Sequence, residues 1–275
     1  MVYRGFVLLI FVGLLLVQHD GRAEDRPVPV DKSLLEYIFT GEESLHYRVS
    51  WSGGLKIGDL WMNIRRVKED GGFVIQVRVT DQGLFRLFYP VNDSFATFVR
   101  GPWKLPWRYE VHQQEGFGGR TVTRLTLYDQ RNGVVRYRKN GQPWSEFTLD
   151  MPAYNEFSSF WVTRALPLDQ PRTAVVPTFV DRTLHHVKVR ILGREMKKTL
   201  FGEVPTIKVQ PRMNFRGLYD KDGDTVFWIT DNACRIPVEI RSKILIGSLV
   251  SELVEYSNTR CTRQGHPLPG IALDQ

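Results

Sequence analysis

Hydrophobic and polar residues alternate along much of the chain with a period of two. In residues 45–51, apolar side chains at every second position are separated by His46, Arg48 and Ser50, and residues 73–79 repeat the pattern. Alternation of this kind predicts a β-strand with one face buried and the other in water. Further strand-like runs cover residues 95–99, 107–112, 121–128, 134–138, 173–180, 184–192, 206–210, 225–230, 236–240 and 244–256.

Short turns separate several of these predicted strands. Asn132-Gly133, Asn140-Gly141 and Asp222-Gly223 supply residues that adopt positive φ, which tight hairpins need. Strands joined by hairpins form an antiparallel sheet rather than parallel βαβ units. Because strands twist, a sheet with this many strands curls instead of staying flat. We therefore predict a mainly β fold with a strongly curved antiparallel sheet, either barrel-like or a β-spiral.

Two segments have helical spacing instead. Asp31 can cap a short helix ahead of the first strand. Within residues 154–165, aromatic side chains recur every three or four positions, with Asn155 as the N-cap and Pro167 as the stop. This pattern predicts one amphipathic helix of about three turns. Its bulky aromatic face needs a concave surface to fill, such as the inside of a curved sheet.

The N-terminus has the pattern of a secretory signal peptide. Arg4 precedes an apolar run over residues 5–17, and small residues follow at Gly21 and Ala23. A helix needs about 20 apolar residues to span a membrane, so an uncleaved anchor is the less favoured interpretation. We expect residues 1–23 to be removed by cleavage after Ala23, leaving a protein with no integral membrane segment.

The remaining chain has no internal repeat and no low-complexity linker. We therefore expect a polar linker and short helix over residues 24–40, a single β-rich domain over residues 41–256, and a C-terminal tail over residues 257–275.

Composition narrows the class of protein further. The 275 residues are 42% hydrophobic and 24% charged, which excludes a disordered tail, a collagen-like repeat and a disulfide-dense miniprotein. The chain has 37 Lys and Arg against 30 Asp and Glu, a formal charge of +7. A basic exported protein suits contact with anionic lipid or polysaccharide, although the same charge also serves solubility. The basic residues are scattered along the sequence, so we do not expect nucleic acid as a partner.

The chain has two cysteines, Cys234 and Cys261. In an exported protein, two cysteines favour one disulfide, which here would join the tail to the β-rich domain. The alternative is a pair of free thiols. A metal site is not expected, because two cysteines without a nearby histidine do not supply four ligands.

No catalytic or cofactor-binding motif stands out in the sequence. It contains no GxSxG, SxxK, HExxH or phosphate-binding glycine loop. His185 and His186 are adjacent on a predicted strand, so their side chains point to opposite faces and cannot share a metal. We therefore expect no catalytic residues, no cofactor and no metal.

The distribution of aromatic residues suggests where a ligand could bind. Trp103 and Trp107 lie in a proline-containing turn, and exposed tryptophans often mark a binding surface. Together with Phe157 and Trp161 of the predicted helix, they are our candidates for the lining of an apolar ligand site. The alternative is that the two turn tryptophans cap the end of a barrel core.

Three stretches together resemble a known family: Gly41-Glu42 with residues 45–51 and Gly58; the helix positions Ser158, Trp161 and Arg164; and residues 227–231 and 235–240 with Gly247, Glu252 and Leu253. In this order and spacing they resemble domain-of-unknown-function family 3108, exported proteins of Gram-negative bacteria. The resemblance covers about residues 40–256 and implies a periplasmic, mostly β protein. It supplies no catalytic residues. Such proteins look similar in fold to periplasmic β-spiral envelope-integrity proteins and, more distantly, to lipoprotein carriers, but fold alone does not determine function.

These observations favour a non-enzymatic periplasmic protein that binds a lipid, an acyl chain or another apolar component of the cell envelope. A concave and mostly apolar interior is the usual ligand site. One alternative is a fully packed β scaffold that acts through contacts with another envelope protein. A third is a hydrolase whose site the sequence does not disclose.

Overall fold

The structure is a computed structural model that describes residues 29–40, 42–68, 71–82, 90–116, 120–168, 173–212, 225–244 and 247–263. The predicted signal peptide lies outside these residues, as does most of the predicted C-terminal tail. The helices are α1 (Lys32–Phe39), α2 (Glu156–Arg164) and α3 (Thr259–Arg263). The strands are β1 (Ser44–Trp51), β2 (Leu55–Arg66), β3 (Phe73–Asp81), β4 (Asn92–Arg100), β5 (Leu105–Glu115), β6 (Arg120–Asp129), β7 (Val134–Lys139), β8 (Ser145–Thr148), β9 (Ala174–Val180), β10 (Thr183–Thr199), β11 (Gly202–Arg212), β12 (Thr225–Thr230), β13 (Pro237–Lys243) and β14 (Ser248–Ser257).

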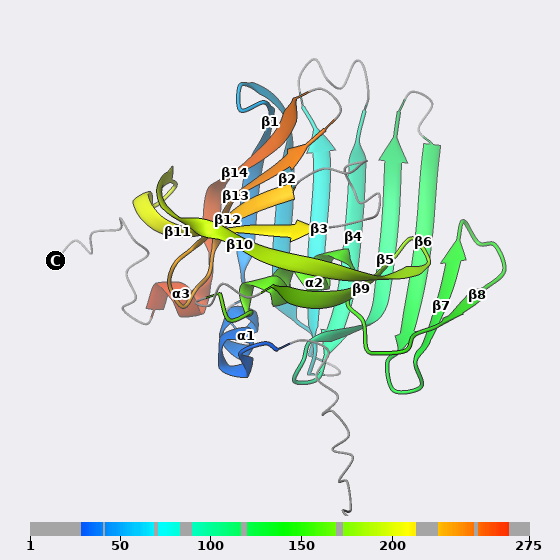
Figure 1. Cartoon of the computed structure of the whole chain (residues 1–275). Helices are drawn as coiled ribbons and strands as arrows, with labels where there is room; N and C mark the ends of the chain where they lie inside the picture. Colours follow the sequence, from blue (N-terminus) through cyan, green and yellow to red (C-terminus); the bar gives the residue numbers. More distant parts are fainter. Residues whose placement is uncertain are drawn as a thin grey trace, which may run out of the picture.

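These strands form one antiparallel sheet of 14 strands in the order β8-β7-β6-β5-β4-β3-β2-β1-β14-β13-β12-β11-β10-β9. The chain therefore runs outward from β1 to one edge, crosses through α2 to the opposite edge, and returns until β14 pairs with β1. In Figure 1, β9 and β10 cross in front of the strands around β4 and β5. The predicted mainly β, strongly curved antiparallel sheet is confirmed.

The two edges of the curled sheet approach each other through side chains. The ring of Phe179 on β9 lies 5.8 Å from that of Phe147 on β8 and 6.1 Å from that of Tyr128 on β6. The edge of β9 also exchanges backbone hydrogen bonds with Tyr154, just before α2. β8 and β9 are nevertheless the two ends of the strand order, so the sheet curls without closing.

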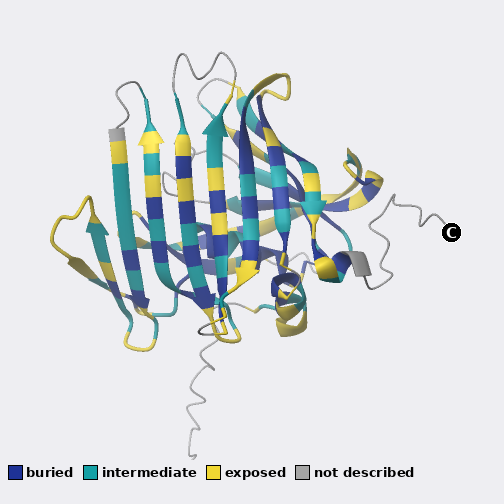
Figure 2. Cartoon of the chain, turned by 180° about the vertical axis from the view of Figure 1, so that it is seen from behind, coloured by how far each residue is buried: buried dark blue, intermediate teal, exposed yellow. Residues whose placement is uncertain are grey.

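Burial alternates along many strands as the sequence predicts, and Figure 2 shows the resulting bands. In β1, for example, Leu45, Tyr47 and Val49 are buried. β2 is absent from the sequence prediction because its alternation changes phase. Ile57 is an extra residue opposite the Val49–Ser50 step of β1, and the adjacent Gly58 has no room for a Cβ beside the carbonyl oxygen of Thr80.

Other elements also differ from the prediction. The short strand β8 is not expected from the sequence. β10 continues past a bulge near Leu192 to Thr199. The strand predicted to start at Ile244 starts at Ser248 instead, because the chain first turns through Gly247, whose φ is positive.

α2 lies inside the curled sheet and contacts both β4 and β9. Asn155 caps it as predicted, and its side chain accepts a hydrogen bond from the backbone N–H of Ser158 at 2.9 Å. The helix has nine residues, or about two and a half turns, which is shorter than predicted. It is also less amphipathic than predicted, since Ser158 and Arg164 are as fully buried as Trp161.

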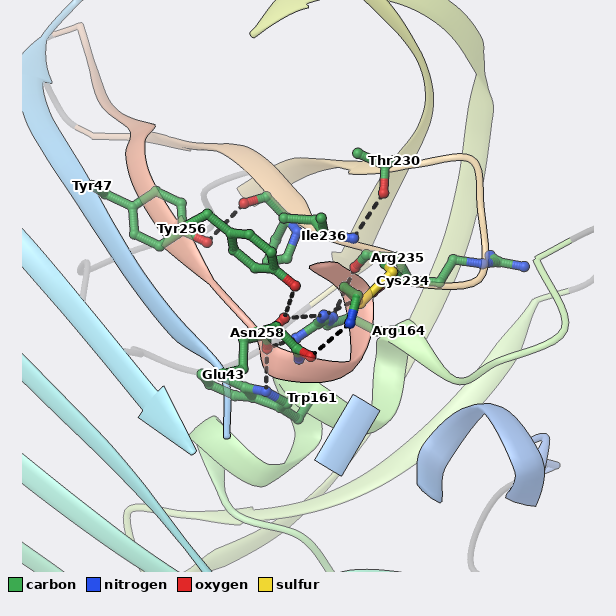
Figure 3. Close-up of polar contacts among 12 residues, drawn as sticks. Glu43, Tyr47, Trp161, Arg164, Thr230, Cys234, Arg235, Ile236, Tyr256 and Asn258 are labelled. Carbon is green, nitrogen blue, oxygen red and sulfur yellow. Dashed lines mark hydrogen bonds and ion pairs between the residues drawn. A yellow bond between two sulfur atoms is a disulfide. The ribbon is translucent and has the colours of Figure 1, made fainter. Parts of the chain in front are cut away.

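A buried ion pair fixes the C-terminal end of α2 (Figure 3). Arg164 makes two hydrogen bonds to the carboxylate of Glu43, including Nη2 to Oε1 at 2.8 Å, and neither side chain is exposed to solvent. The Trp161 indole and the Tyr256 hydroxyl also donate to Glu43, at 3.2 and 3.1 Å. The Nε and Nη2 groups of the guanidinium also donate to backbone carbonyls between β12 and β13, including that of Cys234 at 3.0 Å. Both charges are therefore compensated by internal partners.

The predicted disulfide between Cys234 and Cys261 is present and confirmed. Cys261 lies on α3, a helix within the predicted tail whose first turn is capped by the side chain of Asn258. The bridge thus attaches α3 to Cys234, whose backbone carbonyl accepts a hydrogen bond from Arg164. Within the described residues, no helix is long and apolar enough to cross a membrane.

Replacing Arg164 with methionine is expected to lower the free energy of unfolding by about 3–5 kcal/mol, because Glu43 is left as an uncompensated buried charge. Urea denaturation followed by tryptophan fluorescence measures this loss. The matched control is Arg48→Met, which breaks the exposed Arg48–Glu252 pair and should cost no more than about 1 kcal/mol. Equal losses in the two variants would show that the buried pair does not anchor α2.

Removing the disulfide in the double variant Cys234→Ser/Cys261→Ser is expected to lower stability by about 3–4 kcal/mol. The bridge joins residues 27 apart in sequence and restricts the unfolded chain. Urea midpoints with and without dithiothreitol measure the effect. Reductant should destabilise the wild-type protein and leave the double variant unchanged. A double variant as stable as the oxidised wild type contradicts the prediction.

Candidate functional site

An apolar cavity of about 160 Å³ lies between α2 and the concave side of the sheet. The empty space around it, including the part open to solvent, is about 1090 Å³. Strands from both halves of the sheet form its wall. The apolar side chains that line it include Leu60, Met62, Val77, Val176, Val187 and Phe227.

One face of α2 forms the remaining wall. Glu156, Ser159, Phe160 and Thr163 follow the spacing of a single helix face, and all four line the cavity. The hydroxyl of Ser159 donates to the carbonyl of Glu156 at 2.9 Å, and that of Thr163 donates to the carbonyl of Ser159 at 2.7 Å. Because these hydroxyls bond to the helix itself, this wall is less polar than its sequence suggests.

The acidic side chain in the wall is Glu156, the first residue of α2. Its Oε1 accepts a hydrogen bond from the Tyr109 hydroxyl at 3.0 Å. Its Oε2 is buried and has no hydrogen-bond partner among the described residues. Burial raises the pKa of Glu156, although its own backbone N–H, the nearby positive charge of Arg124 and the Tyr109 hydrogen bond oppose this shift. Burial, together with the charge of Glu156, also holds the pKa of Tyr109 and Tyr128 well above the usual value for tyrosine.

Arg124 connects this end of the cavity to polar groups on neighbouring strands. Its Nη2 donates to Gln113 at 2.6 Å, and its Nη1 lies 3.7 Å from a carboxylate oxygen of Asp181, in the turn between β9 and β10. Gln113 in turn donates to Asp93 at 2.9 Å. Burial raises the pKa of Asp93 to about 6, and the neighbouring Glu115 adds to the rise.

The structure does not bring the four sequence-predicted ligand residues together. Phe157 lines the cavity and packs against Phe95, with ring centroids 5.0 Å apart. Trp161 is fully buried on another face of α2, where it bonds to Glu43.

The two turn tryptophans lie outside the lining of this cavity. Trp103 packs under the ammonium group of Lys32, 4.5 Å from the ring centroid. Trp107 packs against Phe98 and borders a separate groove together with Arg100 and Arg136.

Other lining residues were missed by reasoning from sequence. Leu60 and Met62 belong to β2, the strand that the sequence prediction omits. Glu156 carries no sequence signal of a ligand contact, because an acidic residue is common in the first turn of any helix. Among the described residues, no group of three or more His, Cys, Asp and Glu side chains is placed to hold a metal ion.

The raised pKa of Asp93 predicts a specific dependence of stability on pH. The unfolded carboxyl ionises near its ordinary pKa of about 3.9, and the folded one only near 6. The contribution of Asp93 to stability is therefore complete below about pH 4 and is lost as the pH rises through 6.

Asp93→Asn should consequently gain stability relative to the wild type between pH 4 and 7, as measured by urea midpoints at each pH. The exposed Asp150→Asn serves as the control and should follow the wild type. A difference between Asp93→Asn and the wild type that is constant across this range would contradict the assignment.

Comparison with solved structures places the fold among β-barrel-like proteins. The chain is similar to the beta-barrel-like protein of domain of unknown function DUF1849 from Brucella abortus, with a TM-score of 0.57 and 7% sequence identity, covering 79% of this chain and 98% of that one. The hypothetical protein CT021 from Chlamydia trachomatis matches with a TM-score of 0.32 and 9% identity over 82% and 92% of the two chains, and this similarity is too low to support an argument. At such identities the first comparison concerns the fold alone. No curated protein has a sequence significantly similar to this chain.

Comparison with protein families gives a more specific result. The family model described as protein of unknown function (DUF3108) matches residues 46–254, which is most of the chain. The match includes the strands that form the cavity and the whole of α2. It confirms the resemblance noted in the sequence. This chain belongs to the DUF3108 family of proteins of unknown function.

Proposed function

We propose that this protein is a non-enzymatic component of the cell envelope that binds an apolar chain, such as the acyl group of a lipid, in the cavity between α2 and the sheet. The observation that supports this most directly is the apolar wall contributed by α2 and by both halves of the sheet. Burial of an alkyl chain against such a wall is favourable by about 0.8 kcal/mol for each methylene group.

The dimensions of the cavity bear on how much of a ligand it can enclose. A cavity of about 150 Å³ holds one benzene molecule, whereas pockets for larger ligands span about 300–1,000 Å³. The 160 Å³ of the cavity therefore accommodates part of an alkyl chain. The surrounding space, part of which is open to solvent, can take the rest of the ligand.

The proposed location is the periplasm. The predicted signal peptide supports export, and the Cys234–Cys261 disulfide supports an oxidising compartment, where such bridges form and persist.

A second candidate function is a scaffold that binds another envelope protein. Three apolar side chains along the outer half of the β10–β11 hairpin are exposed: Leu192 at the bulge by 46%, Met196 by 57% and Leu200 in the turn by 47%. Exposed apolar side chains of this size favour contact with a partner. A protein that carries no bound lipid and binds no apolar probe would favour this second function over the first.

Filling the cavity should weaken binding of an apolar ligand. Val176 points into the cavity and its neighbour Val175 is 37% exposed, so the two positions form a matched pair. Val176→Phe is expected to weaken binding of diphenylhexatriene at least about tenfold, because the larger ring occupies the space that the probe needs. Val175→Phe should bind like the wild type. Fluorescence titration measures both.

Native mass spectrometry of protein purified gently from a periplasmic extract tests the same proposal without a probe. A lipid mass that is present in the wild type, lost on denaturation and absent from Val176→Phe supports lipid binding. An apo mass for the wild type, combined with equal probe affinity in both variants, would exclude this cavity as the binding site.

A further inference from the structure

The β10–β11 hairpin carries most of the net positive charge of the chain. Residues 183–212 contain seven Lys and Arg against two Asp and Glu, a surplus of five, whereas the formal charge of the whole chain is +7. Lys188, Arg190 and Lys198 are exposed, and none of them forms an ion pair with another described residue. The hairpin is therefore a local source of positive potential on the surface.

The outer part of this hairpin extends past the strands on both sides of it. β9 pairs with β10 only as far as Val189, and β12 pairs with β11 only over residues 206–209. In Figure 1, the end of the hairpin, drawn in yellow near the label β11, lies on the opposite side of the molecule from β7 and β8. The exposed side chains of Leu192, Met196 and Leu200 follow one another at four-residue intervals on this projecting part.

The free edge of β10 does not suit the addition of another strand. A bulge at Leu192 interrupts the regular ladder, and Lys197 and Lys198 follow it. Bulges and lysines are features by which edge strands avoid pairing with other chains. Contacts of this edge with a partner are therefore expected to be made by its side chains.

The spacing of the apolar side chains favours a lipid surface over a protein. Leu192 and Met196 are separated by about 13 Å along an extended strand, and the charged Arg194 lies between them. The centre of a protein interface is instead close-packed and depleted of charge. A fluid bilayer accommodates separate apolar side chains in its interfacial region, while Lys and Arg beside them contact anionic head groups.

We infer that the outer part of the hairpin, residues 188–208, docks on an anionic lipid bilayer. Its three exposed apolar side chains enter the head-group region, and the basic residues around them lie against lipid phosphates. This part of the hairpin shares no residue with the lining of the cavity, so the inference does not depend on what the cavity binds. The same apolar side chains support the second candidate function, and the charge of the hairpin favours lipid as the partner.

Co-sedimentation of the protein with sucrose-loaded vesicles tests the inference. The vesicles contain either phosphatidylcholine alone or phosphatidylcholine with about 30% phosphatidylglycerol. Each basic residue at an anionic surface strengthens binding about fivefold, so the wild type should bind the phosphatidylglycerol vesicles at least about tenfold more tightly. Raising the salt concentration to about 0.5 M should remove most of this difference, because it screens the charges.

A first pair of variants tests the apolar contacts. Met196→Ser/Leu200→Ser is expected to weaken binding to phosphatidylglycerol vesicles at least about tenfold, because two apolar side chains no longer leave water. The control is Leu55→Ser, at the start of β2, where the leucine is exposed by 60%. This control should bind like the wild type.

A second pair of variants tests the charge. Lys188→Gln/Arg190→Gln should weaken binding at least about tenfold. The control Arg65→Gln/Lys139→Gln removes the same charge from exposed positions on β2 and β7, and it should stay within about threefold of the wild type. Urea denaturation of each variant confirms that it is folded.

Three outcomes overturn the inference. A wild type that does not bind the phosphatidylglycerol vesicles leaves the exposed apolar side chains to a protein partner. Equal losses in the variants and their controls show that the contact does not involve this hairpin. Loss of binding in the charge variant alone, with Met196→Ser/Leu200→Ser unchanged, indicates attraction to any polyanion without entry into a bilayer.

Discussion

The Glu43–Arg164 ion pair joins the residue before β1 to the last turn of α2 in a region that excludes water. Removing two charges from water is expensive, so a pair of this kind adds little stability compared with a well-packed apolar substitute. The pair instead fixes the position of α2. The Arg164 guanidinium donates both to the Glu43 carboxylate and to a carbonyl group next to the disulfide. One placement of α2 makes both sets of hydrogen bonds at once.

This anchoring explains why a cavity persists beside α2. Protein interiors normally fill such spaces, because unfilled volume forfeits van der Waals contacts. Here Trp161 and Arg164 hold the helix by one part of its surface, while Glu156 and Phe160 face the open space on another. Moving α2 to fill the cavity would break the buried polar contacts. The polar cluster and the apolar site are therefore two consequences of the same constraint.

Sequence reasoning was most successful where a signal is local. The alternation in β1 and β3, the caps of α1 and α2, and the class of fold all follow from neighbouring residues. β2 was missed because the bulge beside Gly58 reverses its alternation. Glu43 and Arg164 are 121 residues apart, so no local pattern links them. The tryptophans could be recognised as unusual, but which face of the sheet each one meets depends on bulges and on the curl.

The pairing of β1 with β14 has a consequence for how the chain acquires its structure. The first and last strands are neighbours in the middle of the sheet, and Tyr256 bonds to Glu43 across 213 residues of sequence. The other neighbouring strands in the order are consecutive in sequence, so this pairing closes by far the longest loop in the sheet and is expected to form last. The central ladder cannot assemble until the C-terminal strand has been synthesised, so the newly made chain passes through a long interval with unpaired strand edges, in which a holding chaperone would be of use.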